Sequence, residues 1–145
     1  MAYLIPGTNP PIYNVEQAVG QNSPNARGDV MLVQYLLHHL YGNAAPDLKV
    51  DGWIGPITLR WIKQFQIDLK QHGYSIVADG RVDRAGATKS SVSKTFYTIL
   101  WMQKLLFEKN PAAYALLPKY VPLSAKPKPS PYSDAGLVIP ASGGF

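Results

Sequence analysis

The chain of 145 residues contains no cysteine, so it has no disulfide, no thiolate metal ligand and no cysteine nucleophile. Histidine is also scarce, and two of the three histidines, His38 and His39, are adjacent in the sequence. Adjacent side chains on a helix point about 100° apart, so these two imidazoles do not share a metal ion. We therefore predict that the protein binds neither a metal ion nor another cofactor.

Motifs typical of enzymes are absent from the sequence. It contains no HExxH, no phosphate-binding loop, no GxSxG and no GxGxxG. Glu16 and Glu108 are the only glutamates, so a glycosidase-like carboxylate pair would need aspartates such as Asp51 and Asp79. We expect these two aspartates to hold loops instead, and we predict that the protein is not an enzyme.

No apolar stretch approaches the length of a membrane span. The first residues also lack the basic start and the continuous apolar run of a signal peptide, because Pro6, Pro10 and Pro11 interrupt them. We expect neither a membrane span nor a standard leader.

The formal net charge is +5 and the pI is about 9.4. A basic protein attracts anionic polymers, including nucleic acids and carboxylate-bearing wall polymers. The cations are mixed with acids along the chain and surround no nucleic-acid-reading motif, so we do not expect a nucleic-acid partner.

The thirteen prolines are concentrated towards the two ends of the chain. This distribution predicts an extended N-terminal arm over residues 1–24, a helical domain over residues 25–117 and an extended Pro-rich tail over residues 118–145. We expect both arms to lie against the domain or against neighbouring chains.

Three helices are predicted in the central domain, over residues 29–41, 56–71 and 92–109. Their apolar residues recur at helical spacing. The inward stripes are Val30, Val33, Leu37 and Leu40; then Thr58, Ile62, Phe65 and Leu69; then Phe96, Ile99, Leu100, Gln103, Leu106 and Phe107. A further short helix is expected over residues 112–117. These elements predict an all-α fold.

An Asp-Gly pair precedes the second helix and another precedes the third, at Asp51-Gly52 and Asp79-Gly80. Glycine adopts a positive φ that other residues resist. An aspartate in such a turn accepts a hydrogen bond from the backbone N–H two residues later. Both pairs are therefore expected to form tight turns.

Taken in order, a set of residues from about 25 to 107 resembles the peptidoglycan-binding-domain-like (PGBD-like) family, whose small three-helix modules attach many proteins to murein. The set comprises Gly28, Val33-Gln34, Leu36 or Leu37, Asp51-Gly52, Ile54-Gly55-Pro56, Thr58, Ile62, Phe65-Gln66 and Asp79-Gly80. The resemblance implies an all-α, compact three-helix bundle with Asp-Gly loops and extended flanking arms. It also implies that the motif residues Gly28, Asp51, Gly52, Gly55, Thr58, Phe65, Gln66, Asp79 and Gly80 chiefly build the fold.

The resemblance further implies a wall-polymer ligand, held by stacking of sugars on aromatic rings, by hydrogen bonds and by cations near peptide carboxylates. The candidate ligand-binding residues are Gln34, Tyr35, Trp53, Arg60, Trp61, Lys63 and Arg81. Tryptophans such as Trp53 and Trp61 are more often partly buried packing residues, which is the alternative interpretation. Arg60, Lys63 and Lys70 can equally form a solvated face.

Two functions are compatible with these observations. The first is a non-catalytic peptidoglycan-binding module. The second is a structural component of a phage tail, baseplate or related injection particle, which uses the same fold and its two arms to dock on other proteins. In either case we expect a protein that is carried by a particle or exported by a non-standard route, and that acts at the bacterial cell wall.

Overall fold

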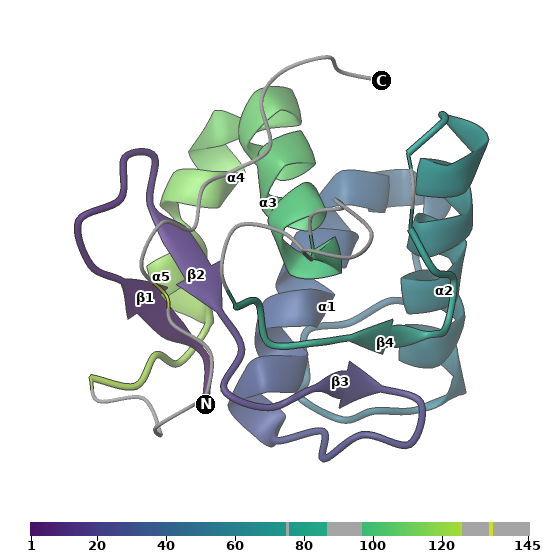
Figure 1. The fold of residues 1–145 in the computed structure, drawn as a ribbon, viewed down its shortest axis with the longest axis horizontal. Helices are drawn as coiled ribbons and strands as arrows, with labels where there is room; N and C mark the ends of the chain where they lie inside the picture. The colour runs from purple at the N-terminus through teal and green to yellow at the C-terminus, as the bar shows by residue number, and fades with distance from the viewer. Residues whose placement is uncertain (75, 87–96, 126–133, 135–145) are drawn as a thin grey trace.

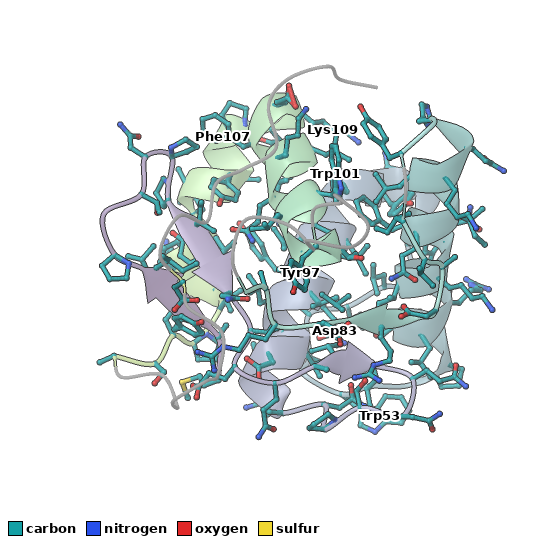
Figure 2. All side chains as sticks on the ribbon, in the orientation of Figure 1. Trp53, Asp83, Tyr97, Trp101, Phe107 and Lys109 are labelled. Atoms are coloured by element: carbon teal, nitrogen blue, oxygen red, sulfur yellow. The ribbon has the colours of Figure 1, made fainter. Side chains whose placement is uncertain are left out.

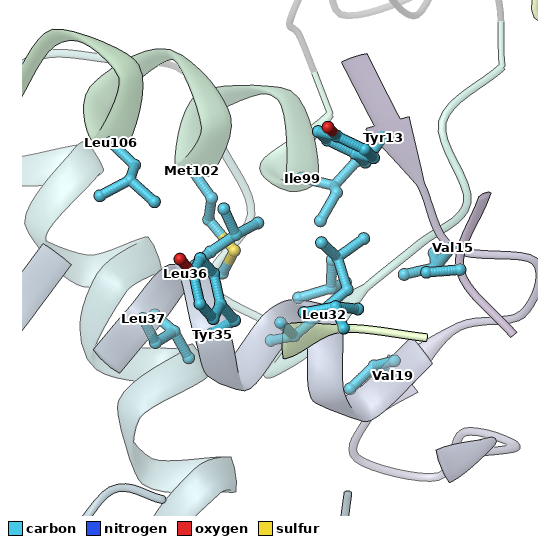
Figure 3. Packing of buried hydrophobic residues seen from close by; sticks show 14 of the residues in the cluster. Tyr13, Val15, Val19, Leu32, Tyr35, Leu36, Leu37, Ile99, Met102 and Leu106 are labelled. Atoms are coloured by element: carbon cyan, nitrogen blue, oxygen red, sulfur yellow. The ribbon is translucent and has the colours of Figure 1, made fainter. Parts of the chain in front are cut away.

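The computed structural model describes residues 1–74, 76–86, 97–125 and 134. Its centre is the helix α1 (Arg27–Tyr41), which packs against α2 (Pro56–Gln71) and α3 (Thr98–Lys109) (Figure 1). A short 3₁₀ helix, η1 (Gly42–Ala44), follows α1, and two short helices, α4 (Pro111–Ala115) and α5 (Leu117–Tyr120), follow α3. The buried side of α1 faces the core with Leu32, Leu36 and Leu37 (Figure 3).

The N-terminal residues form a hairpin in which β1 (Tyr3–Ile5) pairs antiparallel with β2 (Ile12–Asn14). Tyr3 and Ile5 are buried whereas Leu4 between them is exposed, which is the alternation of a strand with one face on a core. Figure 3 shows Tyr13 of β2 beside Ile99 of α3. The hairpin therefore belongs to the core, where we had expected an extended arm.

A second antiparallel pair joins β3 (Val19–Gly20) to β4 (Arg81–Val82). Gly20 has a φ of +124°, and a Cβ on it would lie 2.1 Å from the carbonyl oxygen of Gly80. Only glycine permits this close approach of two backbones. The pair ties the segment before α1 to the second Asp-Gly turn.

The prediction of an all-α fold is wrong. Among the described residues there are five α-helices and two small antiparallel sheets, so the fold is mixed α and β. The strands escaped the sequence analysis because each has only two or three residues, too few for a periodic pattern. β3 pairs with β4 about sixty residues later in the sequence. The segment between β1 and β2 contains prolines, which the sequence analysis interprets as interruptions of regular structure.

The helix predictions fared better. The second helix occupies the predicted residues, and the first begins two residues before its predicted start. The third ends at Lys109 as predicted and begins at Thr98; residues 92–96 of the predicted helix lie outside the described residues. The predicted tail begins inside α5, in which Pro118 occupies the first turn, a position where proline costs no hydrogen bond. Of the remaining tail, residues 126–133 and 135–145 lie outside the described residues.

Gln103 joins the hairpin to α3. Its Oε1 accepts the N–H of Tyr13 at 2.7 Å, and its Nε2 donates to the carbonyl of Tyr13 at 2.7 Å. The hydroxyl of Tyr114 on α4 also donates to Oε1, at 2.9 Å. Because Gln103 is fully buried, this amide satisfies backbone groups of β2 that water does not reach.

Candidate functional site

The first Asp-Gly turn, residues 51–53, is held by the buried side chain of Gln34 on α1. Oε1 of Gln34 accepts the N–H groups of Asp51 and Gly52 at 3.0 and 2.8 Å. Its Nε2 donates to Asp51 Oδ1, to the carbonyl of Trp53 and to Thr58 Oγ1, at 3.0 to 3.1 Å. One amide therefore determines where this turn lies relative to α1 and α2.

The second Asp-Gly turn, residues 79–81, repeats this arrangement one helix later. Oε1 of Gln66 on α2 accepts the N–H of Gly80 at 2.9 Å. Its Nε2 donates to Asp79 Oδ1, to the carbonyl of Arg81 and to Thr98 Oγ1, at 3.3, 2.8 and 3.4 Å. The two Asp-Gly pairs thus belong to a repeated unit, in which a helical glutamine holds the turn and also contacts a threonine of the next helix.

Both turns have the chemistry that the Asp-Gly pairs predict. Gly52 and Gly80 have φ values of +78° and +75°. Asp51 and Asp79 each accept, at 3.0 Å, the N–H two residues later. Among the other motif residues, Thr58 and Phe65 are buried as expected, and Gly28 lies against Met1 at the start of α1.

The two turns differ in what they present to solvent. In the first turn the indole ring of Trp53 lies over Gly55, and a Cβ on Gly55 would be 2.2 Å from Cζ3 of Trp53. Trp53 is nevertheless 67% exposed and lies at the edge of the molecule (Figure 2). We name this ring, supported by the backbone at Gly55, the Trp53 platform. In the second turn the equivalent residues, Arg81 and Asp83, form an ion pair at 3.2 Å.

The Trp53 platform borders a cleft of about 450 Å³, which we name the Trp53 cleft. Its lining residues are Gln34, Asp47, Lys49, Asp51, Trp53, Gly55, Ile57 and Thr58. Sequence analysis missed Asp47, Lys49 and Ile57 as site residues. Asp47 and Lys49 belong to a loop without a motif, and their only sequence signal is that they shortly precede the first Asp-Gly turn.

Asp51 supplies negative charge to this cleft. The N–H of Trp53, and then the amide of Gln34, lower the pKa of Asp51 below its ordinary value. The carboxylate therefore stays ionised at neutral pH. With Lys49 beside it, the cleft offers hydrogen-bond acceptors and donors next to an apolar ring, a combination suited to a polyhydroxylated ligand.

Arg60 and Trp61 border the same cleft, because both side chains contact its lining residue Asp47. The guanidinium of Arg60 contacts Asp47 at 3.2 Å, and the indole N–H of Trp61 donates to it at 3.4 Å. The Trp61 ring is half-buried and lies 4.8 Å from the ring of Tyr41. Trp61 is therefore a packing residue with a polar edge, whereas Arg60 is exposed at the rim.

The other predicted ligand residues fall elsewhere. Tyr35 is buried, and its hydroxyl donates to the carbonyl of Ala113. Lys63 is exposed one turn along α2 from Arg60. Arg81 belongs to the second turn and does not line the Trp53 cleft. Of the seven predicted residues, Gln34 and Trp53 line this cleft, and Arg60 and Trp61 border it.

A separate cleft of about 500 Å³ lies between the C-terminal ends of α1, α2 and α3. Its polar groups bond to one another: the hydroxyl of Tyr41 donates to Asp68, Lys109 donates to the carbonyl of Leu40, and Glu108 pairs with Lys104. The Phe65 and Tyr41 rings that line it are also less accessible, since Phe65 is buried and Tyr41 is half-buried, so neither is an aromatic platform as exposed as Trp53.

Within the described residues, no group of three or more histidine, aspartate or glutamate side chains is placed to hold a metal ion. None of the helices in this part of the chain has the length and apolarity needed to cross a membrane. No family model matches the sequence, and neither a curated protein nor a solved structure is significantly similar to the chain.

Proposed function

We propose that the protein is a non-catalytic module that binds the glycan of peptidoglycan through the Trp53 platform and its cleft. The observation that carries this proposal is the exposed indole ring supported by the backbone at Gly55. A large exposed aromatic ring gains little from folding alone, whereas a sugar that packs its C–H face on the ring removes apolar surface from water.

Preorganisation makes the ring a better binding surface than a mobile side chain. The Gln34 amide holds the backbone of residues 51–53, and Gly55 leaves room for the ring to rest on the chain. A ring that is already ordered loses little rotamer freedom when a ligand binds. Asp51 and Lys49 then supply partners for hydroxyl and amide groups at the ring's edge.

Peptidoglycan is the glycan that the motif residues favour, because the platform belongs to the Asp-Gly turn on which the resemblance to the PGBD-like family rests. The same proposal includes action at the bacterial cell wall, with the protein carried by a particle or exported by a non-standard route. The net charge of +5 favours approach to a carboxylate-bearing wall.

The alternative, a structural component of a particle that docks on other proteins through its arms, has weaker support. Tyr3, Ile5, Ile12 and Tyr13 of the predicted N-terminal arm are buried in the chain's own core. Asp134 in the predicted tail accepts a hydrogen bond from Tyr3 of the same chain at 2.9 Å. These contacts leave less of the arms for a partner protein.

Retention of the purified protein on murein sacculi tests the proposal. We expect the unmodified protein to be retained, and Trp53→Ala to lower the affinity about ten- to hundredfold, as expected for loss of a central aromatic contact. The matched control is Val77→Ala, which removes another exposed apolar side chain beyond the opposite end of α2. Equal retention of all three proteins, or retention of none, would contradict glycan binding at Trp53; self-association without retention would support the docking alternative.

Gly55→Ala tests the platform itself. Gly55 has a φ of −131°, which any residue adopts, so the added methyl group acts mainly by displacing the Trp53 ring. We expect this variant to fold, to shift the indole N–H resonance of Trp53 in an NMR spectrum and to lose retention as Trp53→Ala does. A displaced ring with full retention would show that the orientation of Trp53 is irrelevant to binding.

A further inference from the structure

A second aromatic pocket has a volume of about 390 Å³, and we name it the Tyr120 pocket. It is lined by Tyr35, His38, His39, Val50, Leu116 and Tyr120. Leu116 joins α4 to α5 and Tyr120 is the last residue of α5; both are about half exposed, whereas Tyr35 is buried. Leu116 and Tyr120 therefore leave apolar surface exposed to solvent beside this pocket, and such exposed apolar surface often marks a binding site.

The rings of this pocket form a wall of aromatic faces. The ring of Tyr120 is nearly parallel to that of Tyr35, with an interplanar angle of 18° and centroids 6.1 Å apart. The imidazole of His39 lies 4.4 Å from the Tyr35 ring. Tyr35 is anchored by its bond to Ala113, so the exposed Tyr120 ring rests on a fixed support, as Trp53 rests on Gly55.

The two histidines add polar groups to the pocket. Nδ1 of His38 lies 3.0 Å from the carbonyl oxygen of Leu48, which only accepts, so this nitrogen carries a proton. Burial, and then the neighbouring His38, lower the pKa of His39. The lowered pKa favours a neutral His39 imidazole, which offers one donor and one acceptor to hydroxyl and amide groups.

The Tyr120 pocket and the Trp53 cleft are lined by neighbouring residues of one loop. Val50 lines the pocket, while Lys49 and Asp51 on either side of it line the cleft. On α1, Gln34 in the cleft and His38 in the pocket are four residues apart, so they lie on one face with a rise of about 6 Å along the axis. Residues 49–51 thus separate the two sites, and a ligand long enough to reach both rings would cross this loop.

We propose that the Tyr120 pocket is a second sugar-binding subsite, across residues 49–51 from the Trp53 cleft, so that the protein binds the interior of a glycan strand rather than a single disaccharide. This inference rests on the proposed function. The repeating chemistry of a glycan supplies the argument for the occupant, because two aromatic platforms on either side of one loop suit a polymer that presents similar rings in succession.

Titration with peptide-free murein glycan fragments of one, two and four disaccharide units tests this inference. For the unmodified protein we expect the affinity to rise with fragment length. In Tyr120→Ala we expect the affinity for the four-unit fragment to fall about five- to tenfold, the effect of losing one aromatic contact, while the affinity for the one-unit fragment stays unchanged. Tyr120→Phe keeps the ring and is expected to bind as the unmodified protein does.

Leu116→Ser is a second variant at an exposed position of the same pocket, and it is expected to weaken only the longer fragments. Trp53→Ala is expected to weaken fragments of every length. If Trp53 is required but affinity is independent of length, or if Tyr120→Ala binds the long fragment normally, the second subsite is refuted and the proposed function stands. If the unmodified protein binds no fragment, both proposals are wrong.

Discussion

At the scale of single residues, three buried glutamines, one on each long helix, hold backbone that belongs to other elements. Gln34 and Gln66 hold the two Asp-Gly turns, and Gln103 holds Tyr13 of β2. These glutamines differ in the exposure of their partners. Asp51 and Trp53 are exposed, so their backbone groups bond to water if Gln34 is lost, whereas Tyr13 is buried.

We therefore predict that Gln103→Leu destabilises the fold more than Gln34→Leu does. Loss of the amide at Gln103 leaves the N–H and C=O of Tyr13 buried without partners, at a cost of about 3 kcal/mol or more in the free energy of unfolding. Gln34→Leu is expected to cost about 1 kcal/mol. Urea unfolding of both variants measures the difference, and equal losses would show that the accessibility of the partners does not matter.

Asp29 is a single residue that makes the stability of the fold depend on pH. Burial raises the pKa of Asp29 above its ordinary value of 3.8, although the N–H groups of Glu16 and Gln17 donate to its oxygens. The folded state thus binds this proton more tightly than the unfolded state, so the contribution of Asp29 to stability is present at low pH and is lost as pH rises through its native pKa. Relative to Asp29→Asn, the unmodified protein is expected to lose stability as pH rises from about 4. Urea unfolding of both proteins over that pH range measures the difference. If the unmodified protein instead gains stability relative to Asp29→Asn, the pKa of Asp29 is lowered by folding and not raised.

At the scale of elements, the β1–β2 hairpin is part of the core rather than an appendage. Ile5 and Leu4 are neighbours on β1, but Ile5 is 4% exposed and Leu4 is 47% exposed. We predict that Ile5→Ala lowers the free energy of unfolding by about 2–4 kcal/mol through loss of buried apolar surface. The matched variant Leu4→Ala is expected to change it by less than about 1 kcal/mol. Thermal denaturation followed by circular dichroism compares the two, and an unaffected Ile5→Ala would mean that the hairpin does not stabilise the helices.

At the scale of the whole molecule, the hairpin and the three long helices share one cluster of buried residues. A shared core predicts one cooperative transition rather than separate melting of an arm and a domain. Far-UV circular dichroism, which reports the helices, and tryptophan fluorescence, which reports local packing, are expected to give the same midpoint. Two separate midpoints would indicate that the N-terminal residues unfold independently.

Local sequence determined the parts of this protein that local chemistry controls. Pro56 and a period of 3.6 residues were enough to locate α2, because proline suits a first helical turn and the apolar stripe has only one way to face a core. The Asp-Gly pairs were enough to predict both turns, because glycine tolerates a positive φ and aspartate bonds two residues ahead.

Tertiary structure alone decided which residues are available to a ligand. Gln34 and Tyr35 are adjacent and were both ligand candidates, yet both are buried, since α1 packs against α2, α3 and β3. The sequence left two interpretations of Trp53 open, a packing residue and a binding residue. Trp53 is exposed because the turn held by Gln34 directs its ring outward over Gly55. The strand pairing of Val19 with Val82, and the meeting of Tyr120 with Tyr35, join segments more than sixty residues apart. Such contacts arise only when the chain closes on itself, and no local pattern encodes them.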